Sequence, residues 1–139
     1  MDIQIEREIG TDDLVALYDS VGWRAYTRSP DTLATAIANS SIVVTARDEH
    51  GALIGLARGL SDDASVFYLQ DILVHPDHQR SGIGRQLLTV CLERYSHVRQ
   101  KVLLTDDDEV QQRFYESLGY VHTSNVTGAS LNAFVRFDV

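Results

Sequence analysis

The sequence predicts a single-domain α/β protein, residues 1–139, with a mixed, mostly antiparallel central sheet flanked by helices. Three observations lead to this fold class. A length of 139 residues suits one compact domain. Hydrophobic residues make up 44% of the chain and charged residues 23%, the composition of an ordinary globular protein. Apolar residues then follow strand and helix spacings in the order β-α-α-β-β-β-α-β-α-β.

The N-terminal part of the chain predicts one strand and two helices. Ile3 and Ile5 alternate with polar residues, as in a half-buried strand. Thr11 precedes two aspartates and starts a helix that ends at Gly22, and Ser29 followed by proline starts a second helix. The apolar faces of these two helices comprise Leu14, Leu17, Tyr18 and Val21, and then Leu33, Ala34 and Ile37.

The rest of the chain predicts five strands and two helices. Strands at 42–47, 52–59 and 65–74 are separated by short polar turns, which predicts antiparallel neighbours. A helical stripe from Ile83 to Tyr95 and an apolar strand at 102–104 follow. The order closes with a helix over roughly 109–118, stopped by Gly119, and a final strand over 131–137.

The charge of the chain narrows the classes of partner. Twelve basic and 20 acidic residues give a net charge of −8, and the isoelectric point is near 4.9. Such a balance disfavours binding to nucleic acid or to an anionic membrane. The single cysteine, Cys91, cannot form an internal disulfide, and the N-terminus lacks the pattern of a signal peptide. We therefore expect a cytoplasmic protein without a membrane span.

The segment from Tyr68 to Arg85 carries the strongest chemical signal. A predicted strand runs into a loop at the start of a helix, where the backbone N–H groups of residues 80–85 can converge on one anion. Gly82 and Gly84 allow close approach of the backbone to a phosphate, and Arg80 and Arg85 add positive charge. An ordinary helix-entry turn is the alternative. A P-loop does not fit, because the only lysine is Lys101.

This segment resembles the acyl-CoA loop of the GNAT superfamily of acetyl-CoA-dependent N-acetyltransferases. Residues 79–84, Gln-Arg-Ser-Gly-Ile-Gly, match the family pattern Gln/Arg-x-x-Gly-x-Gly/Ala and follow a Val-x-Pro strand exit at 74–76. Residues 113–120, Arg-Phe-Tyr-Glu-Ser-Leu-Gly-Tyr, are similar to the helix-end signature Tyr-Glu-x-x-Gly-Phe/Tyr. The predicted order of elements also suits the family fold.

The resemblance implies acetyl-CoA as co-substrate and assigns residues to it. Backbone groups at Ile72, Leu73 and Val74 would bind the pantetheine arm, with the N–H near Leu73 facing the thioester carbonyl. Tyr115 would protonate the leaving thiolate. The family often has Asn seven residues before this tyrosine, where the chain has Asp108, so a cofactor contact there is an open question. The pyrophosphate would be bound by Gln79, Arg80, Ser81, Gly82, Ile83, Gly84 and Arg85.

Asp71 has two interpretations of equal weight. It lies three residues before Val74, a position at which some relatives carry an acid, and it could take the proton of the attacking amine directly or through water. It could equally form an ion pair with an arginine.

Aromatic residues elsewhere also have two interpretations. Trp23 and Tyr26 fall in the link between the first two helices, where the family builds part of the acceptor site, or they pack in the core. Tyr115 could likewise be an ordinary core aromatic. His75 and His78 lack a third ligand, so we expect no metal site.

These residues predict an N-acetyltransferase that acts by direct attack in a ternary complex. The acceptor is a primary amine, on a small molecule, a polyamine or a protein, and the acidic chain favours a cation. The alternative is an acyl-CoA-binding sensor or partner module without turnover, and a plain interaction domain is a third reading. The resemblance also implies a possible homodimer.

Overall fold

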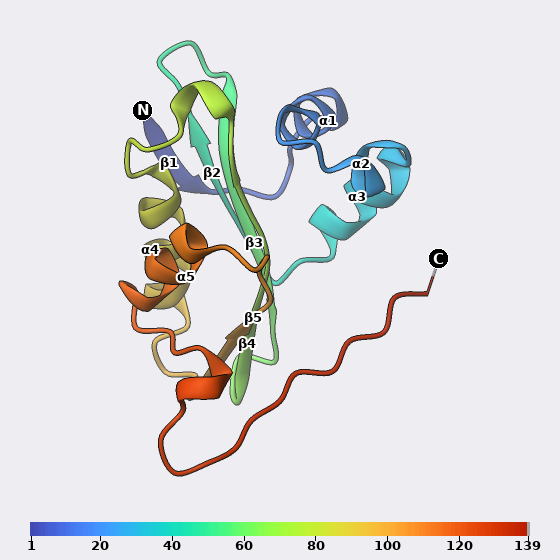
Figure 1. The fold of residues 1–139 in the computed structure, drawn as a ribbon. Coiled ribbons are helices and arrows are strands. Elements are labelled where there is room, and N and C mark those ends of the chain that lie inside the picture. The colour runs from blue at the N-terminus through green and yellow to red at the C-terminus, as the bar shows by residue number, and fades with distance from the viewer. Residues whose placement is uncertain (139) are drawn as a thin grey trace. The chain divides into compact units, whose positions relative to one another are not determined.

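The computed structural model describes residues 1–138, and its internal contacts define two compact units, residues 1–104 and residues 105 onward. The first unit holds the whole sheet and the second begins directly after it (Figure 1). A single domain over 1–139 stays a prediction.

Within residues 1–138 the sheet has five strands, one fewer than predicted, and they lie side by side in chain order. The strands are β1 (Asp2–Ile5), β2 (Ile42–Arg47), β3 (Leu53–Ser61), β4 (Val66–Val74) and β5 (Gln100–Leu103). Strands β1 to β4 pair antiparallel, and β5 joins the edge of β4 in parallel. The predicted mixed, mostly antiparallel sheet is therefore confirmed.

Helices cover both faces of the sheet. Helices α1 (Thr11–Ser20) and α3 (Pro30–Ala38) lie on one face, joined by the short helix α2 (Arg24–Thr27), and α4 (Ile83–Arg94) lies on the other (Figure 1). The sequence did not predict α2 as a helix. The first face buries one apolar cluster, which comprises Leu14, Leu17, Tyr18, Leu33, Ile37, Val43, Leu53, Leu56 and Leu73.

A β-bulge in β4 changes which face its side chains reach. Arg58 pairs with Asp71 and Gly59 with Leu69, so Gln70 is the extra residue of the bulge. Before it, Phe67 stacks on Tyr95 at the end of α4, with ring centroids 4.8 Å apart. After it, Asp71 reaches α1 on the opposite face. One inserted residue thus directs Asp71 toward α1 rather than α4.

Strands β4 and β5 separate along part of their length. Their pairing runs from Val66 to Leu69 on β4, while β4 itself continues to Val74. Within the described residues, no strand pairs with residues 70–74 on this side. This segment, here called the open edge of β4, leaves backbone groups available to a ligand.

The second unit contains α5 (Glu109–Glu116) and a short 3₁₀ turn (Thr123–Asn125). The side chain of Asp108 caps α5, because its Oδ1 accepts the N–H of Val110 at 2.9 Å.

The predicted strand over 131–137 is wrong. No strand forms there, and Phe134 and Phe137 are 93% and 90% exposed. Alternation shows that a segment is competent to be a strand, but a strand also requires a hydrogen-bonded partner.

Replacing Gly59 with Ala is expected to destabilise the sheet by about 1–3 kcal/mol, because the new Cβ would overpack the core. That Cβ would lie 2.3 Å from Cε1 of Phe67 and 2.9 Å from the Tyr68 carbonyl oxygen. Urea unfolding measures the loss. The control is Gly10→Ala, whose Cβ would meet nothing closer than 3.7 Å. Equal stability of the two variants would contradict the packing at Gly59.

Candidate active site

The loop before α4 leaves the N–H groups at the N-terminus of that helix without a side-chain cap. Arg80 and Gly82 both adopt left-handed backbone conformations, with φ of 64° and 83°. No side chain caps α4, since the Ser81 hydroxyl instead donates to the His78 carbonyl at 2.6 Å. The N–H groups of the first turn are therefore directed at the loop without a side-chain cap, which suits an anion.

This loop carries two arginines and is hydrogen-bonded to β4. Arg80 and Arg85 are exposed on either side of Gly82, and Gln79 donates from Nε2 to the Val74 carbonyl at 2.9 Å. The residues predicted to bind pyrophosphate, 79–85, thus lie together at the end of the open edge. The arrangement fits a phosphate group.

The backbone orientation of the open edge follows from the strand register. The N–H of His75 donates to the Ile54 carbonyl at 2.8 Å, so this pair of residues is hydrogen-bonded. Hydrogen-bonded pairs recur at every second position of an antiparallel ladder, which directs the backbone of Leu73 toward Leu56 on β3. Ile72 and Val74 therefore direct their N–H and C=O groups to the open edge, where the Val74 carbonyl already accepts the hydrogen bond from Gln79.

This orientation corrects one sequence prediction. The resemblance implies an N–H near Leu73 that faces a thioester carbonyl. By this register the Leu73 N–H itself points to β3, and the outward N–H groups belong to Ile72 and Val74. The sequence could not reveal this, because which alternate residues of β4 direct their backbone groups outward depends on the register with β3.

Asp71 lies at the centre of a buried polar network and is only 4% exposed. Its Oδ2 accepts from Arg58 Nε at 2.7 Å and from the Tyr18 hydroxyl at 2.9 Å. Its Oδ1 accepts from the Tyr26 hydroxyl at 2.8 Å. The ion pair with an arginine, one of the two interpretations of Asp71, is thus present in the structure.

Arg58 extends the network to further elements. Its Nη1 donates to the Ser40 hydroxyl at 3.3 Å, and its Nη2 donates to the Tyr26 hydroxyl at 3.3 Å. Its guanidinium also lies 5.7 Å from the centroid of the Tyr26 ring. One buried pair thereby connects α1, α2, β3 and β4.

The two tyrosines remain proton donors in this environment. Burial, and then the negative charge of Asp71, raise the pKa of Tyr18 and of Tyr26 above the ordinary value. Both hydroxyls therefore stay neutral at physiological pH and can donate to the carboxylate.

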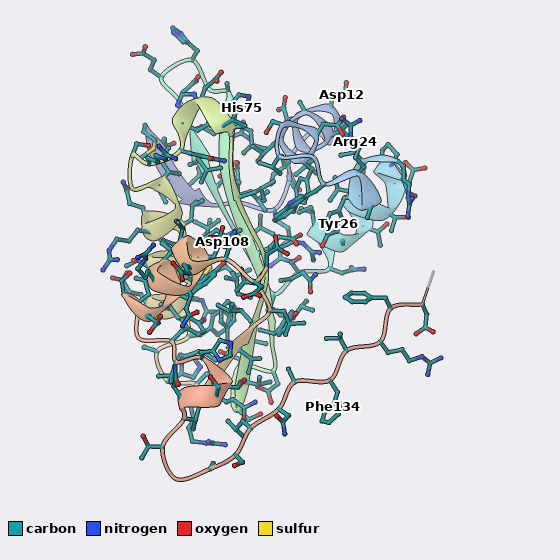
Figure 2. The ribbon with its side chains drawn as sticks, viewed as in Figure 1. Asp12, Arg24, Tyr26, His75, Asp108 and Phe134 are labelled. Atoms are coloured by element: carbon teal, nitrogen blue, oxygen red, sulfur yellow. The ribbon has the colours of Figure 1, made fainter. Side chains whose placement is uncertain are left out.

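The two predicted acceptor aromatics, Trp23 and Tyr26, lie beside this network. Trp23 packs against the apolar cluster, with its ring 5.9 Å from that of Tyr18 and 6.3 Å from that of Tyr26. Tyr26, labelled in Figure 2, is half-buried, and its hydroxyl accepts from Gln70 Nε2 at 3.2 Å. The structure brings these aromatics together with Asp71.

Tyr115 and Asp108 belong to the second unit. The Tyr115 ring lies 5.1 Å from that of Phe114 and 6.0 Å from that of Tyr120. Burial raises the pKa of the Tyr115 hydroxyl, and a hydrogen bond with Thr105 opposes the rise. A neutral tyrosine of this kind carries a proton it can donate.

Other reactive residues have no such setting. The ring of His75 caps its own turn by accepting the N–H of Asp77 at 3.1 Å, and no group of three potential metal ligands occurs within residues 1–138. Burial raises the pKa of the Cys91 thiol to about 12, so it stays protonated. None of the helices within the described part of the chain is both long and apolar enough to span a membrane.

Sequence reasoning missed Arg58 and Gln70 and gave Tyr18 only a core role. A signal for Arg58 was available, because it interrupts the apolar run Leu53–Leu60, and a charge in such a strand needs a buried partner. The bulge at Gln70 left no recognisable pattern in the sequence.

Comparisons with known proteins identify the family. The family described as "Acetyltransferase (GNAT) domain" matches residues 38–122. An uncharacterized N-acetyltransferase, ycf52, of Pyropia yezoensis is 30% identical over 120 residues, covering 83% of this chain and 67% of the relative. The chain spans between 50% and 67% of the length of the first curated relatives it matches.

Solved structures share the fold. A GNAT family acetyltransferase from Streptococcus pneumoniae has a TM-score of 0.80 and 28% identity, with 98% of both chains covered. The aminoglycoside N-acetyltransferase AAC(6')-Iy, solved with the bisubstrate analog CoA-S-monomethyl-acetylneamine, has a TM-score of 0.72 and 18% identity over 99% of this chain and 98% of its own. The chain belongs to the GNAT acetyltransferase family.

Replacing Arg58 with Met is expected to lower the free energy of unfolding by about 3–5 kcal/mol, because Asp71 would remain buried without its cation. Urea unfolding measures the change. The matched control is Arg94→Met, which removes the exposed pair with Asp63 at 3.9 Å and is expected to cost no more than about 1 kcal/mol. Similar losses in both variants would show that the Arg58 pair is not a structural anchor.

Proposed function

We propose that the protein transfers the acetyl group of acetyl-CoA to a primary amine by direct attack. The observation that carries this proposal is the continuity of the open edge of β4 with the uncapped start of α4. A peptide-like arm can pair with a strand edge while its phosphate end binds helix N–H groups.

Within this proposal, the pyrophosphate binds the loop at 79–85 and the pantetheine arm extends back along β4. Val74 is nearer to the loop than Ile72, so the thioester at the far end of the arm lies opposite Ile72. The outward N–H of Ile72 then stabilises the negative charge that develops on the carbonyl oxygen during attack.

The reaction forms a C–N bond and breaks the C–S bond of the thioester. The amine nitrogen attacks the carbonyl carbon, the tetrahedral intermediate expels the CoA thiolate, and the thiolate takes a proton. Tyr115 as the donor of that proton stays a prediction. The amine nitrogen loses one proton to water and, with Tyr115 as the donor, the Tyr115 phenolate regains one from water, so the products are the N-acetylated amine and the CoA thiol. A base role for Asp71 stays a prediction, and it requires the amine or a water to displace Tyr26 from Oδ1.

The proposed acceptor is a small-molecule amine, a polyamine or a protein amino group. The net charge of −8 supports a cationic acceptor. AAC(6')-Iy, which shares the fold, is an aminoglycoside acetyltransferase, and this supports an acceptor site beside the CoA site. A cytoplasmic location, a homodimer and a cofactor contact by Asp108 stay predictions.

A thiol-release assay with acetyl-CoA and an amine panel tests the proposal. Suitable amines are 2-phenylethylamine, spermidine and a lysine peptide, with mass spectrometry of each product. We expect CoA release together with an acetylated amine of mass increased by one acetyl group. Binding of acetyl-CoA without release for any amine would instead support the sensor function.

Arg80→Glu is expected to weaken acetyl-CoA binding at least about tenfold, since a charge-assisted contact is replaced by repulsion. Isothermal titration calorimetry measures the affinity. The control, Arg99→Glu, makes the same charge change at an exposed residue beyond the C-terminal end of α4 and should leave the affinity within twofold. Equal loss of acetyl-CoA affinity in both variants would show that only the net charge of the protein matters and would contradict a contact at Arg80.

Tyr115→Phe is expected to lower kcat about 100-fold with little change in the KM of acetyl-CoA, because the leaving thiolate loses its proton donor. Steady-state kinetics measure both constants. Tyr120→Phe removes the hydroxyl of the neighbouring ring and serves as control. Full activity of Tyr115→Phe would refute the acid role.

A further inference from the structure

We propose that the Tyr26 hydroxyl is the atom that binds the acceptor nitrogen, and that Gln70 occupies its place when no acceptor is bound. Asp71 is then a positioning residue that acts through Tyr26. This inference rests on the proposed function for its substrate class, an amine that presents an N–H donor.

Asp71 itself is poorly placed to meet an acceptor. Its side chain is buried, and both carboxylate oxygens already accept hydrogen bonds, from Arg58, Tyr18 and Tyr26. Arg58 also balances its negative charge at 2.7 Å. An incoming amine therefore meets neither an accessible oxygen nor an unbalanced charge at this residue.

Tyr26 is the member of the network that connects the buried Arg58–Asp71 pair to a more exposed part of the surface. Tyr18, Ser40, Arg58 and Asp71 are buried, whereas Tyr26 is half-buried and Gln70 is exposed. The Tyr26 proton is committed to Asp71 Oδ1, so its oxygen is oriented as an acceptor of hydrogen bonds.

The donors on that oxygen differ in how firmly they are held. Arg58 Nη2 donates to it at 3.3 Å from a side chain that the ion pair with Asp71 holds in place, whereas Gln70 Nε2 donates at 3.2 Å from an exposed side chain. An amine N–H offers the same donor chemistry as the Gln70 amide. Exchange of Gln70 for the acceptor leaves every buried group satisfied.

The bulge places this exchange beside the proposed thioester. Gln70 is the extra residue of β4, and Asp71 and Ile72 follow it directly. The acceptor nitrogen on Tyr26 therefore lies on the α1 face of the strand whose open edge presents the Ile72 N–H.

Kinetics of three variants test the inference with the best amine of the panel. Tyr26→Phe should raise the KM of the amine about tenfold, the value of one lost hydrogen bond, with the KM of acetyl-CoA within twofold. Gln70→Ala should lower the KM of the amine at least twofold, because it removes the competing donor. Tyr68→Phe, a partly buried tyrosine on the same strand, is the control.

The opposite signs distinguish the proposal from a structural role. If Tyr26→Phe leaves the KM of the amine within twofold, the contact is refuted. If Gln70→Ala raises that KM or leaves it unchanged, Gln70 is not a placeholder. Thermal unfolding of each variant, compared with Tyr68→Phe, reports any loss of folding separately.

A binding measurement keeps the inference testable if no amine is acetylated. Trp23 is the single tryptophan and its ring lies 6.3 Å from that of Tyr26, so its fluorescence reports on this position. Titration with 2-phenylethylamine, spermidine and the lysine peptide should change the fluorescence, with weaker affinity in Tyr26→Phe. Absence of any change with all three amines would overturn the site, whereas binding without CoA release would overturn only the proposed catalysis.

Discussion

The buried ion pair between Arg58 and Asp71 is the interaction on which the rest of the site depends. Its two charges are removed from water, and that loss is offset only because each is also hydrogen-bonded, to Tyr18, Tyr26 and Ser40. These partners lie on α1, on α2 and two residues after the end of α3. The Arg58–Asp71 ion pair thus fixes how α1 and α2 pack on strands β3 and β4.

Strand geometry lets neighbouring residues of β4 serve different purposes. Side chains stand perpendicular to the sheet, whereas backbone N–H and C=O groups lie in its plane. Asp71 therefore directs its carboxylate to the face covered by α1 and α3, and Ile72 directs its backbone to the open edge. The bulge at Gln70 sets both directions, since without it the side chain of Asp71 would face α4.

Local patterns predicted much of the fold and the loop before α4. Alternation and helical stripes identified strands β1 to β5 and helices α1, α3, α4 and α5, because each pattern lies within a few residues. The Gly82 turn was predictable for the same reason. Features that depend on distant partners could not be predicted. The Arg58–Asp71 pair joins residues on two strands, and the outward direction of the Ile72 backbone depends on the register with β3. Residues 131–137 lack a described partner strand.

Hydrogen exchange at the amides of β4 tests the central claim most directly. In the free protein, the Ile72 and Val74 amides, which face the open edge, should exchange much faster than the Leu73 amide, which is bonded within the sheet. Saturating acetyl-CoA should slow exchange at Ile72, Val74 and the first turn of α4 and leave Leu73 unchanged. Protection confined to other strands, or an Ile72 amide already as slow as that of Leu73, would contradict an acetyl-CoA site at the open edge of β4.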